Sequence, residues 1–227
     1  MATTTPILEA QSVHKTYGKG SSAYEALRGV DLAIRQGESV AIIGKSGSGK
    51  STLMHLLAGL DRPTIGIISY AGRPLSELRE REMANFRNQS VGFIFQQFFL
   101  QPTLTVAENV VLPLKIAGLS RSARLEKAHA ALEKVGLTKW AGHRATDLSG
   151  GQKQRAAIAR ALVTDPKIIF ADEPTGNLDT ETGHEVIKLL FELQKKEGIT
   201  LVVVTHDTDL AKLCDRRVHI SDGKLAS

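Results

Sequence analysis

The chain has 227 residues, of which 42% are hydrophobic and 23% charged, a composition that excludes a disordered chain and suits one folded domain. Its net charge of +5 would favour nucleic acid or an anionic membrane surface, but the basic residues between positions 121 and 144 are scattered as on a solvated helix face, and we expect no nucleic-acid partner. No apolar run approaches the roughly 20 residues of a membrane-spanning helix, so we expect no transmembrane segment.

The chain start and the cysteine usage both predict a protein that stays in the cytoplasm. Residues 1–6 contain no basic residue and no apolar stretch of signal-peptide length. The single cysteine, Cys214, cannot form an internal disulfide, which agrees with a reducing compartment. Because Leu210 and Leu213 lie nearby, we expect its thiol to be buried and to have no chemical role.

Strand-like and helix-like patterns alternate along the chain. In chain order we predict strands at 7–13, 30–34 and 39–43, helix 50–59, strand 67–70, helix 77–88, strand 91–95, helices 106–116, 121–135 and 150–163, strand 167–171, helix 182–197, strand 200–204, helix 207–214 and strand 218–221. This alternation predicts an α/β fold with a mostly parallel sheet. The first strands are joined by turns, which predicts an N-terminal antiparallel β layer, and the succession of helical patterns at 97–148 predicts an inserted helical subdomain.

A glycine-rich segment after the third predicted strand fits the pattern G-x-x-x-x-G-K-[ST] and precedes a predicted helix. Glycines let such a loop wrap tightly, so that its N–H groups and the helix start face a phosphate. The lysine would reach the β and γ phosphates of ATP, and the final serine would be a Mg²⁺ ligand. The predicted ATP-binding residues are Gly44, Lys45, Ser46, Gly47, Ser48, Gly49, Lys50, Ser51 and Thr52.

Polar side chains follow three predicted strands at their carboxyl ends, where α/β sheets bind ligands. Asp172 and Glu173 end an apolar strand; we expect Asp172 in the Mg²⁺ shell and Glu173, pointing the other way, as the base that orients the attacking water. A lone histidine usually has no function, but after a strand of this sheet the imidazole of His206 could exchange hydrogen bonds with the γ-phosphate region. Gln96 can bind water and metal-shell oxygens through its amide. By itself an acidic pair at a strand end is better explained as a solvated turn, but its combination with the phosphate loop favours the catalytic interpretation.

A second candidate anion site opens the helix predicted at 150–163. Its residues are Leu148, Ser149, Gly150, Gly151 and Gln152. A serine alone would cap the helix, so the double glycine predicts that something approaches the backbone closely. A head-to-tail homodimer explains this surplus if each copy lends the segment to the ATP held by the other. ATP would then stabilise the closed dimer, because it would bind the closed dimer more tightly than the open one.

These motifs, in this order, resemble those of the ABC ATPases, the nucleotide-binding subunits of ABC transporters. The resemblance runs from about residue 7 to residue 225. It implies one ABC ATPase domain over residues 1–227, with a P-loop NTPase core at 1–96 and 149–227 and the helical subdomain at 97–148. It further implies Asp179 as the D-loop residue, His206 as the switch histidine, and Tyr17 as the ring that stacks on adenine. From the residues alone, packing on an edge strand explains Tyr17 equally well.

Within that family, the segments 92–98, 105–110 and 174–179 are similar to lipoprotein-releasing, macrolide-exporting and cell-division ATPases. The resemblance implies an integral membrane permease as partner, with few helices and a large extracytoplasmic domain, and a peripheral location on the cytoplasmic face of the inner membrane. Lys45 and Lys153 depart from the usual proline and glutamine, but neither change removes a phosphate ligand.

Apolar residues cluster just after Gln96. They are Phe98, Phe99, Leu100, Leu104 and Val106. They would form either a docking patch for a membrane partner or the helical subdomain's own core. Two other functions are disfavoured. A DNA-maintenance ATPase would carry long coiled coils between its glycine-rich loop and its acidic strand, and no sustained heptad pattern lies between Ser51 and Ile168. A translation-linked ABC protein would usually carry two nucleotide domains in one chain.

Overall fold

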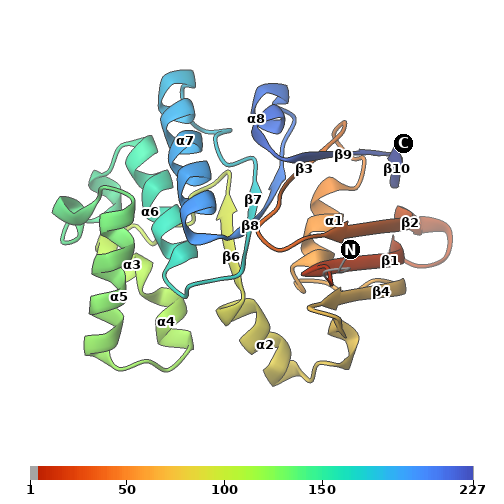
Figure 1. Ribbon diagram of the computed structural model, residues 1–227, viewed down its shortest axis with the longest axis horizontal. Helices are drawn as coiled ribbons and strands as arrows, with labels where there is room; N and C mark the ends of the chain where they lie inside the picture. Colours follow the sequence, from red (N-terminus) through yellow and green to blue (C-terminus); the bar gives the residue numbers. More distant parts are fainter. Residues whose placement is uncertain (1–4, 227) are drawn as a thin grey trace. The chain divides into compact units, whose positions relative to one another are not determined.

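The computed structural model describes residues 5–226 and divides into two units, Met1–Arg87 with Thr200–Ser227 and Asn88–Ile199 (Figure 1). Residues 1–4, which belong to the segment where we expect no signal peptide, lie outside the described residues. The boundary at residue 87 falls within helix α2, Glu80–Gln89.

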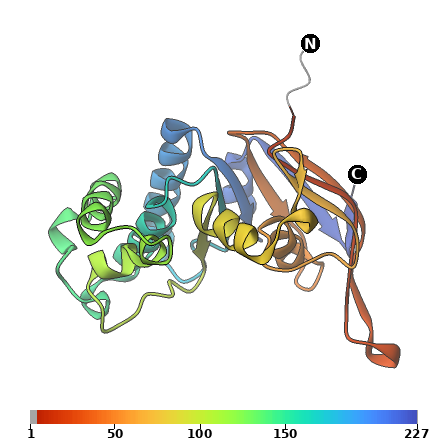
Figure 2. The same ribbon diagram turned by 90° about the horizontal axis from the view of Figure 1, so that it is seen from below.

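The N-terminal part of the first unit is an antiparallel sheet. Its order is β2 (Tyr24–Ile34), β1 (Leu8–Tyr17), β4 (Ile65–Tyr70) and β5 (Arg73–Pro74). Leu8 lies between Ile34 and Tyr70 in the register and is fully buried. The turn between β1 and β2 projects from the sheet (Figure 2). This pairing confirms the expected antiparallel layer.

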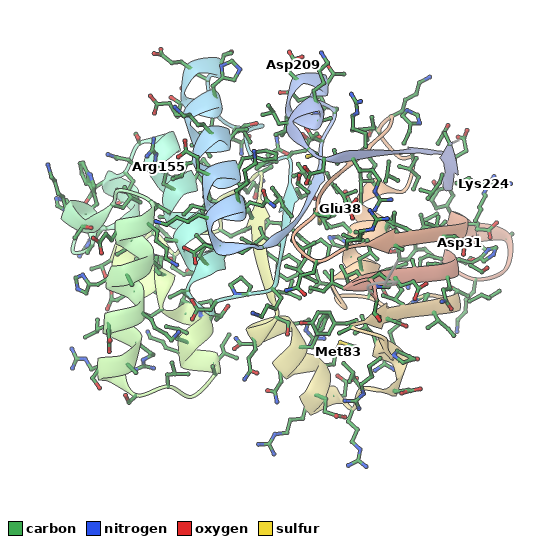
Figure 3. All side chains as sticks on the ribbon, viewed as in Figure 1. Asp31, Glu38, Met83, Arg155, Asp209 and Lys224 are labelled. Atoms are coloured by element: carbon green, nitrogen blue, oxygen red, sulfur yellow. The ribbon has the colours of Figure 1, made fainter. Side chains whose placement is uncertain are left out.

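The rest of the first unit is built on parallel pairing. Strand β3 (Ser39–Ile43) pairs in parallel with β8 (Thr200–Val204) and β9 (Arg216–Ser221), while β10 (Lys224–Ala226) is antiparallel to β9. Helix α1 (Lys50–Leu57) contacts β1, β2 and β8, and α8 (Thr208–Leu213) contacts β3. Where β3 and β9 begin, Glu38 accepts a hydrogen bond from Arg216 Nε at 2.6 Å (Figure 3).

In the second unit, the parallel strands β6 (Val91–Phe95) and β7 (Ile168–Asp172) carry a cluster of helices. Helix α6 (Gly150–Leu162) packs on β6 and contacts α3 (Val106–Val110), α5 (Arg121–Lys134) and α7 (Thr180–Glu197). Arg155 of α6 pairs with Glu185 of α7 at 3.0 Å (Figure 3). Phe170 is fully buried, as the apolar run of a parallel strand requires.

One predicted helix is divided in the structure. The residues expected to form one helix at 106–116 form α3 and α4 (Leu112–Ile116), because Pro113 lacks the N–H that would continue the hydrogen-bond ladder. Short 3₁₀ turns lie at Gly20–Ser22, Leu75–Glu77, Thr138–Trp140 and Ala145–Asp147. The predicted α/β class with antiparallel and parallel sheets is confirmed.

The structure also bears on two expectations drawn from composition. Cys214 is 8% exposed, which confirms that it is buried. Burial, with the charge of Asp215, raises the pKa of its thiol to about 12. Within residues 5–226, no helix combines the length and the apolar character needed to cross a membrane.

Candidate functional site

The glycine-rich loop connects β3 to α1 in the first unit, as predicted. Gly44 has φ 155°, and a Cβ there would lie 2.2 Å from the carbonyl oxygen of Ile220. Gly49 has φ 106°, and a Cβ there would lie 2.6 Å from the carbonyl oxygen of Ala26. Any other residue at these two positions would displace neighbouring backbone, so the tight path of the loop depends on glycine.

Lys50, the first residue of α1, folds back over this loop. Its Nζ donates hydrogen bonds to the carbonyl oxygens of Gly44 and Lys45, both at 2.9 Å. A cationic group is therefore held at the start of a helix, where free N–H groups and the helix dipole already favour an anion. Ser51 and Thr52 occupy the same first turn.

A cavity of about 270 Å³ lies beside the loop. It is lined by Tyr17, Tyr24, Ala26, Ser46, Gly47, Gly49, Lys50, Ser51 and Thr52. The structure thus brings the predicted adenine-stacking ring and the predicted phosphate loop into one cavity. Sequence analysis missed Tyr24, whose hydroxyl donates to the carbonyl oxygen of Gly47 at 3.2 Å. Only the pairing of Tyr17 with Tyr24 across β1 and β2 could have revealed it.

Tyr17 is supported from behind by a charged pair. Its hydroxyl donates to Asp61 Oδ2 at 3.1 Å, and Lys15 Nζ lies 4.9 Å from the centre of its ring. Lys15 also donates to Asp61 Oδ1 at 2.7 Å. Burial would raise the pKa of Asp61, but hydrogen bonds from Lys15, the following backbone N–H and Tyr17 outweigh it and lower the pKa. The ring is 41% exposed and held in place.

The acidic pair ends β7 in the second unit. Asp172 is the last residue of the strand and pairs in register with Phe95 of β6. Glu173 turns the chain, with φ 45°, and its carbonyl accepts a hydrogen bond from Gly176 N at 3.0 Å. A residue other than glycine at positive φ costs roughly 1–3 kcal/mol. Such strain is concentrated at functional sites. Here it lies in the backbone of Glu173, the predicted catalytic residue.

Gln96 contacts the turn that follows Glu173. Asn177 Nδ2 donates to the backbone carbonyl of Gln96 at 2.9 Å, and Gln96 Nε2 lies 3.4 Å from Asn177 Oδ1. A Cβ on Gly176 would stand 2.8 Å from Gln96 Nε2, so the turn approaches this side chain closely. The structure therefore brings Gln96 and the acidic pair together within the second unit.

The segment from Leu148 to Gln152 starts α6 with a capping box. Ser149 Oγ accepts from Gln152 N at 3.3 Å, and Gln152 Oε1 accepts from Ser149 N at 2.9 Å. Leu148 is buried, whereas Gly150 is exposed. For Gly151 the close neighbour belongs to the same chain, because a Cβ there would stand 2.4 Å from Thr182 Cγ2. The double glycine therefore does not by itself require a second copy.

Two further predicted residues cap or flank helices. Asp179 is the N-cap of α7 and accepts a hydrogen bond from Thr182 N at 2.9 Å, which lowers its pKa. His206 is exposed and follows β8 in the first unit, next to the fully buried Thr205. The cap explains Asp179 locally without excluding a further role.

The apolar cluster after Gln96 is divided between core and surface. Val106 is fully buried, whereas Phe99 is 57% exposed and has φ 47°. The guanidinium of Arg160 donates to the carbonyl oxygens of Phe98 and Phe99 at 2.8 and 2.5 Å. The ring of Phe99 packs edge-on against Phe95, with centroids 5.3 Å apart. Val106 therefore belongs to the core of the second unit, and the docking alternative stays a prediction for the exposed Phe99.

Comparison with known proteins places these motifs in a family. Residues 27–176 match the family described as ABC transporter. The chain belongs to this family. Lipoprotein-releasing system ATP-binding protein LolD of Geobacter metallireducens is 45% identical over 221 residues, which are 97% of this chain and 98% of LolD. ABC transporter ATP-binding protein YknY of Bacillus subtilis is 47% identical over 219 residues, covering 96% of this chain and 95% of YknY.

A solved ABC structure is also similar along nearly the whole chain. The dimeric post-hydrolysis state of the ATP-binding cassette MJ0796, bound to ADP and Pi, has a TM-score of 0.87 and 41% identity, covering 97% of both chains. The expected resemblance to ABC ATPases, including the lipoprotein-releasing branch, is confirmed. The chain is an ABC ATPase.

Proposed function

We propose that two copies of this ABC ATPase close around two ATP molecules and that hydrolysis drives a separate membrane permease. The observation that carries the proposal is the single cavity shared by Tyr17 and the glycine-rich loop, because it offers an aromatic face and an anion cradle to one nucleotide. Similarity over nearly the whole chain to a cassette solved as a dimer with ADP and Pi supports it.

In this proposal the phosphates of ATP lie on the glycine-rich loop and the first turn of α1. The loop N–H groups bind phosphate oxygens, and Lys50 exchanges its carbonyl partners Gly44 and Lys45 for the β and γ phosphates. Those carbonyl contacts already hold the ammonium beside the loop, so little side-chain reorganisation is needed. Tyr17 stacks on the adenine ring.

A Mg²⁺ ion suits the oxygen donors available. Ser51 offers a hydroxyl, Asp172 a carboxylate and Gln96 an amide oxygen, and Mg²⁺ prefers such ligands together with phosphate oxygens and water. Among residues 5–226 no three His, Cys, Asp or Glu side chains gather as a metal site. When bound, the ion would neutralise charge on the phosphates.

Glu173 is the proposed general base. Its backbone conformation sends the chain out of β7 into a turn, so its carboxylate need not share the orientation of Asp172. In this role Glu173 accepts a hydrogen bond from the attacking water and orients it toward the γ-phosphate. His206 hydrogen-bonds the γ-phosphate, and Gln96 contacts the water and the metal shell.

The segment from Leu148 to Gln152, which we call the signature segment and which begins the signature helix α6, completes the site from the second copy. Ser149 and Gly150 are exposed at the start of α6, where a hydroxyl and helix N–H groups favour an anion. We assign the segment from Leu148 to Gln152 to contact with the partner's ATP, together with Asp179, whose neighbour Leu178 lies beside Gly150. Closure of the dimer then follows ATP binding, and hydrolysis loosens it.

The permease is proposed to dock on the exposed part of the apolar cluster, which residues 97–148 carry as a helical subdomain. Phe99 provides the exposed ring, and its contact with Phe95 lies one residue from Gln96. Similarity to a protein named as a lipoprotein-releasing system ATP-binding protein supports a transport partner, and we propose that this permease has few helices and a large extracytoplasmic domain. The ATPase would then lie peripherally on the cytoplasmic face of the inner membrane.

The substitution Glu173→Gln tests this proposal. It keeps the size of the side chain but removes the base, so we expect turnover to fall roughly 10²- to 10⁴-fold while ATP still binds. Light scattering with Mg²⁺ and ATP should then show a stable dimer, and a matched sample with ADP should remain monomeric. A strictly monomeric Glu173→Gln chain at high concentration with ATP would overturn the shared-site proposal.

A further inference from the structure

Gln154 is a buried amide that the catalytic scheme does not use. It lies on α6, two residues beyond Gln152, and is 0% exposed. Its Nε2 donates to the carbonyl oxygen of Pro174 at 2.5 Å and lies 3.4 Å from the carbonyl oxygen of Phe95. Its Oε1 is buried with no hydrogen-bond partner among the described residues.

These two carbonyl groups belong to the segments that carry the proposed catalytic residues. Phe95 immediately precedes Gln96, and Pro174 immediately follows Glu173. The ends of β6 and β7 are adjacent in register, with Phe95 opposite Asp172. One side chain from the signature helix therefore contacts both segments where they leave the sheet.

The backbone at Glu173 needs such support. A residue that precedes proline favours extended conformations, yet Glu173 has φ 45°. The hydrogen bond from Gly176 N to the Glu173 carbonyl closes the turn on one side, and Gln154 Nε2 binds the carbonyl of Pro174 in the same turn. Without that donor, the turn could relax and carry the carboxylate with it.

The unpaired Oε1 indicates what the glutamine contributes. A buried polar atom without a hydrogen-bond partner is destabilising. A leucine or methionine would fill the same space and would not bury an unpaired oxygen. The amide is therefore useful here for its N–H groups, which meet the two carbonyl oxygens of Phe95 and Pro174.

We infer that Gln154 is a positioning residue, which couples the signature helix to the Gln96 segment and holds Glu173 in its reactive orientation. This inference rests on the proposed function, since it assumes that Glu173 is the base. It assigns no contact between Gln154 and ATP. Its loss should therefore lower kcat with little effect on the binding of nucleotide.

The variant Gln154→Met tests this, because methionine has a similar volume and no N–H donor. Gln194→Met is the matched control: Gln194 is also buried in the second unit and donates to a backbone carbonyl, that of Ile199, at 3.2 Å. We expect both full-length variants to lose thermal stability, because each loses a buried hydrogen bond. Only Gln154→Met should lower kcat, and by about tenfold, which is the change in an equilibrium that the free energy of one hydrogen bond represents. The KM for ATP should stay within about twofold, as for loss of an interaction made only in the transition state.

Equal kcat values for Gln154→Met and Gln194→Met would overturn the inference, as would a raised KM at unchanged kcat. If Gln154→Met does not fold, Gln154→Asn keeps the amide but shortens its reach, and the same fall in kcat is expected. Glu173→Gln is measured alongside: if it retains full turnover, the proposed function fails, whereas an inactive Glu173→Gln beside an unaffected Gln154→Met rejects the inference alone.

Discussion

Gly151 of α6 lies so close to Thr182 of α7 that a Cβ on the glycine would stand 2.4 Å from the threonine Cγ2. This contact joins the start of the signature helix to the first turn of the helix that Asp179 caps. The second glycine of the motif is thus required by packing inside one chain. Any role in binding the partner's ATP comes in addition to that.

The substitution Gly151→Ala should therefore destabilise the folded chain by about 1–3 kcal/mol through overpacking. Thr182→Ser removes the clashing methyl group, so the double variant should recover most of the lost thermal stability. If it does not, the clash lies elsewhere. ATP-dependent dimerisation of the rescued double variant, measured in the Glu173→Gln background, separates packing from a contact with the partner's ATP.

Asp61→Asn tests the support behind Tyr17. The change removes the negative charge that Lys15 contacts at 2.7 Å, and it weakens the hydrogen bond that Tyr17 donates. We expect the KM for ATP to rise about two- to fivefold, in keeping with a partly exposed ion pair, at nearly constant kcat. Glu80→Gln, which removes an exposed carboxylate paired with Arg62, is the control. Identical KM values in the two variants would contradict the assignment.

Phe99→Glu tests the docking of the permease. The ring is 57% exposed, and a charge there would be desolvated by an apolar partner. We expect stimulation of ATPase activity by the cognate permease in membranes to fall roughly fivefold or more, relative to the basal rate of the same variant. Ile116→Glu changes another exposed apolar residue, 79% exposed on α4, and serves as the control. Unaltered stimulation in Phe99→Glu would place the docking site elsewhere.

The Cys214 thiol should react slowly with thiol reagents in the native protein. Because its pKa rises from 9.0 to about 12, the neutral form is favoured in the folded state. The stabilising contribution is thus fully present below pH 9.0 and is lost progressively as the pH rises towards 12. The rate of thiol labelling at pH 8, with and without denaturant, measures how far the fold protects Cys214. A native rate equal to the denatured rate would contradict the burial.

The local order of the chain was sufficient to predict the glycine-rich loop and the acidic pair. Gly44 to Gly49 connect an apolar strand to the helix that begins with Lys50 and Ser51, and Asp172 and Glu173 lie where another such strand ends. Each of these features depends on neighbours within a few residues, so the sequence displays it directly. The break at Val111 between α3 and α4 was missed, although Pro113 was the local signal.

Other features were decided only by contacts between residues far apart in sequence. The pairing of β1 with β2 brought Tyr24 into the cavity, and the approach of α7 explained Gly151. Val106 is buried whereas Phe99 is exposed, and Gln154 contacts the carbonyl oxygens of Phe95 and Pro174. By itself the sequence determined which chemical groups the protein carries and which elements bear them. The tertiary structure decided which of those groups meet, because close packing depends on distances between segments that no local pattern encodes.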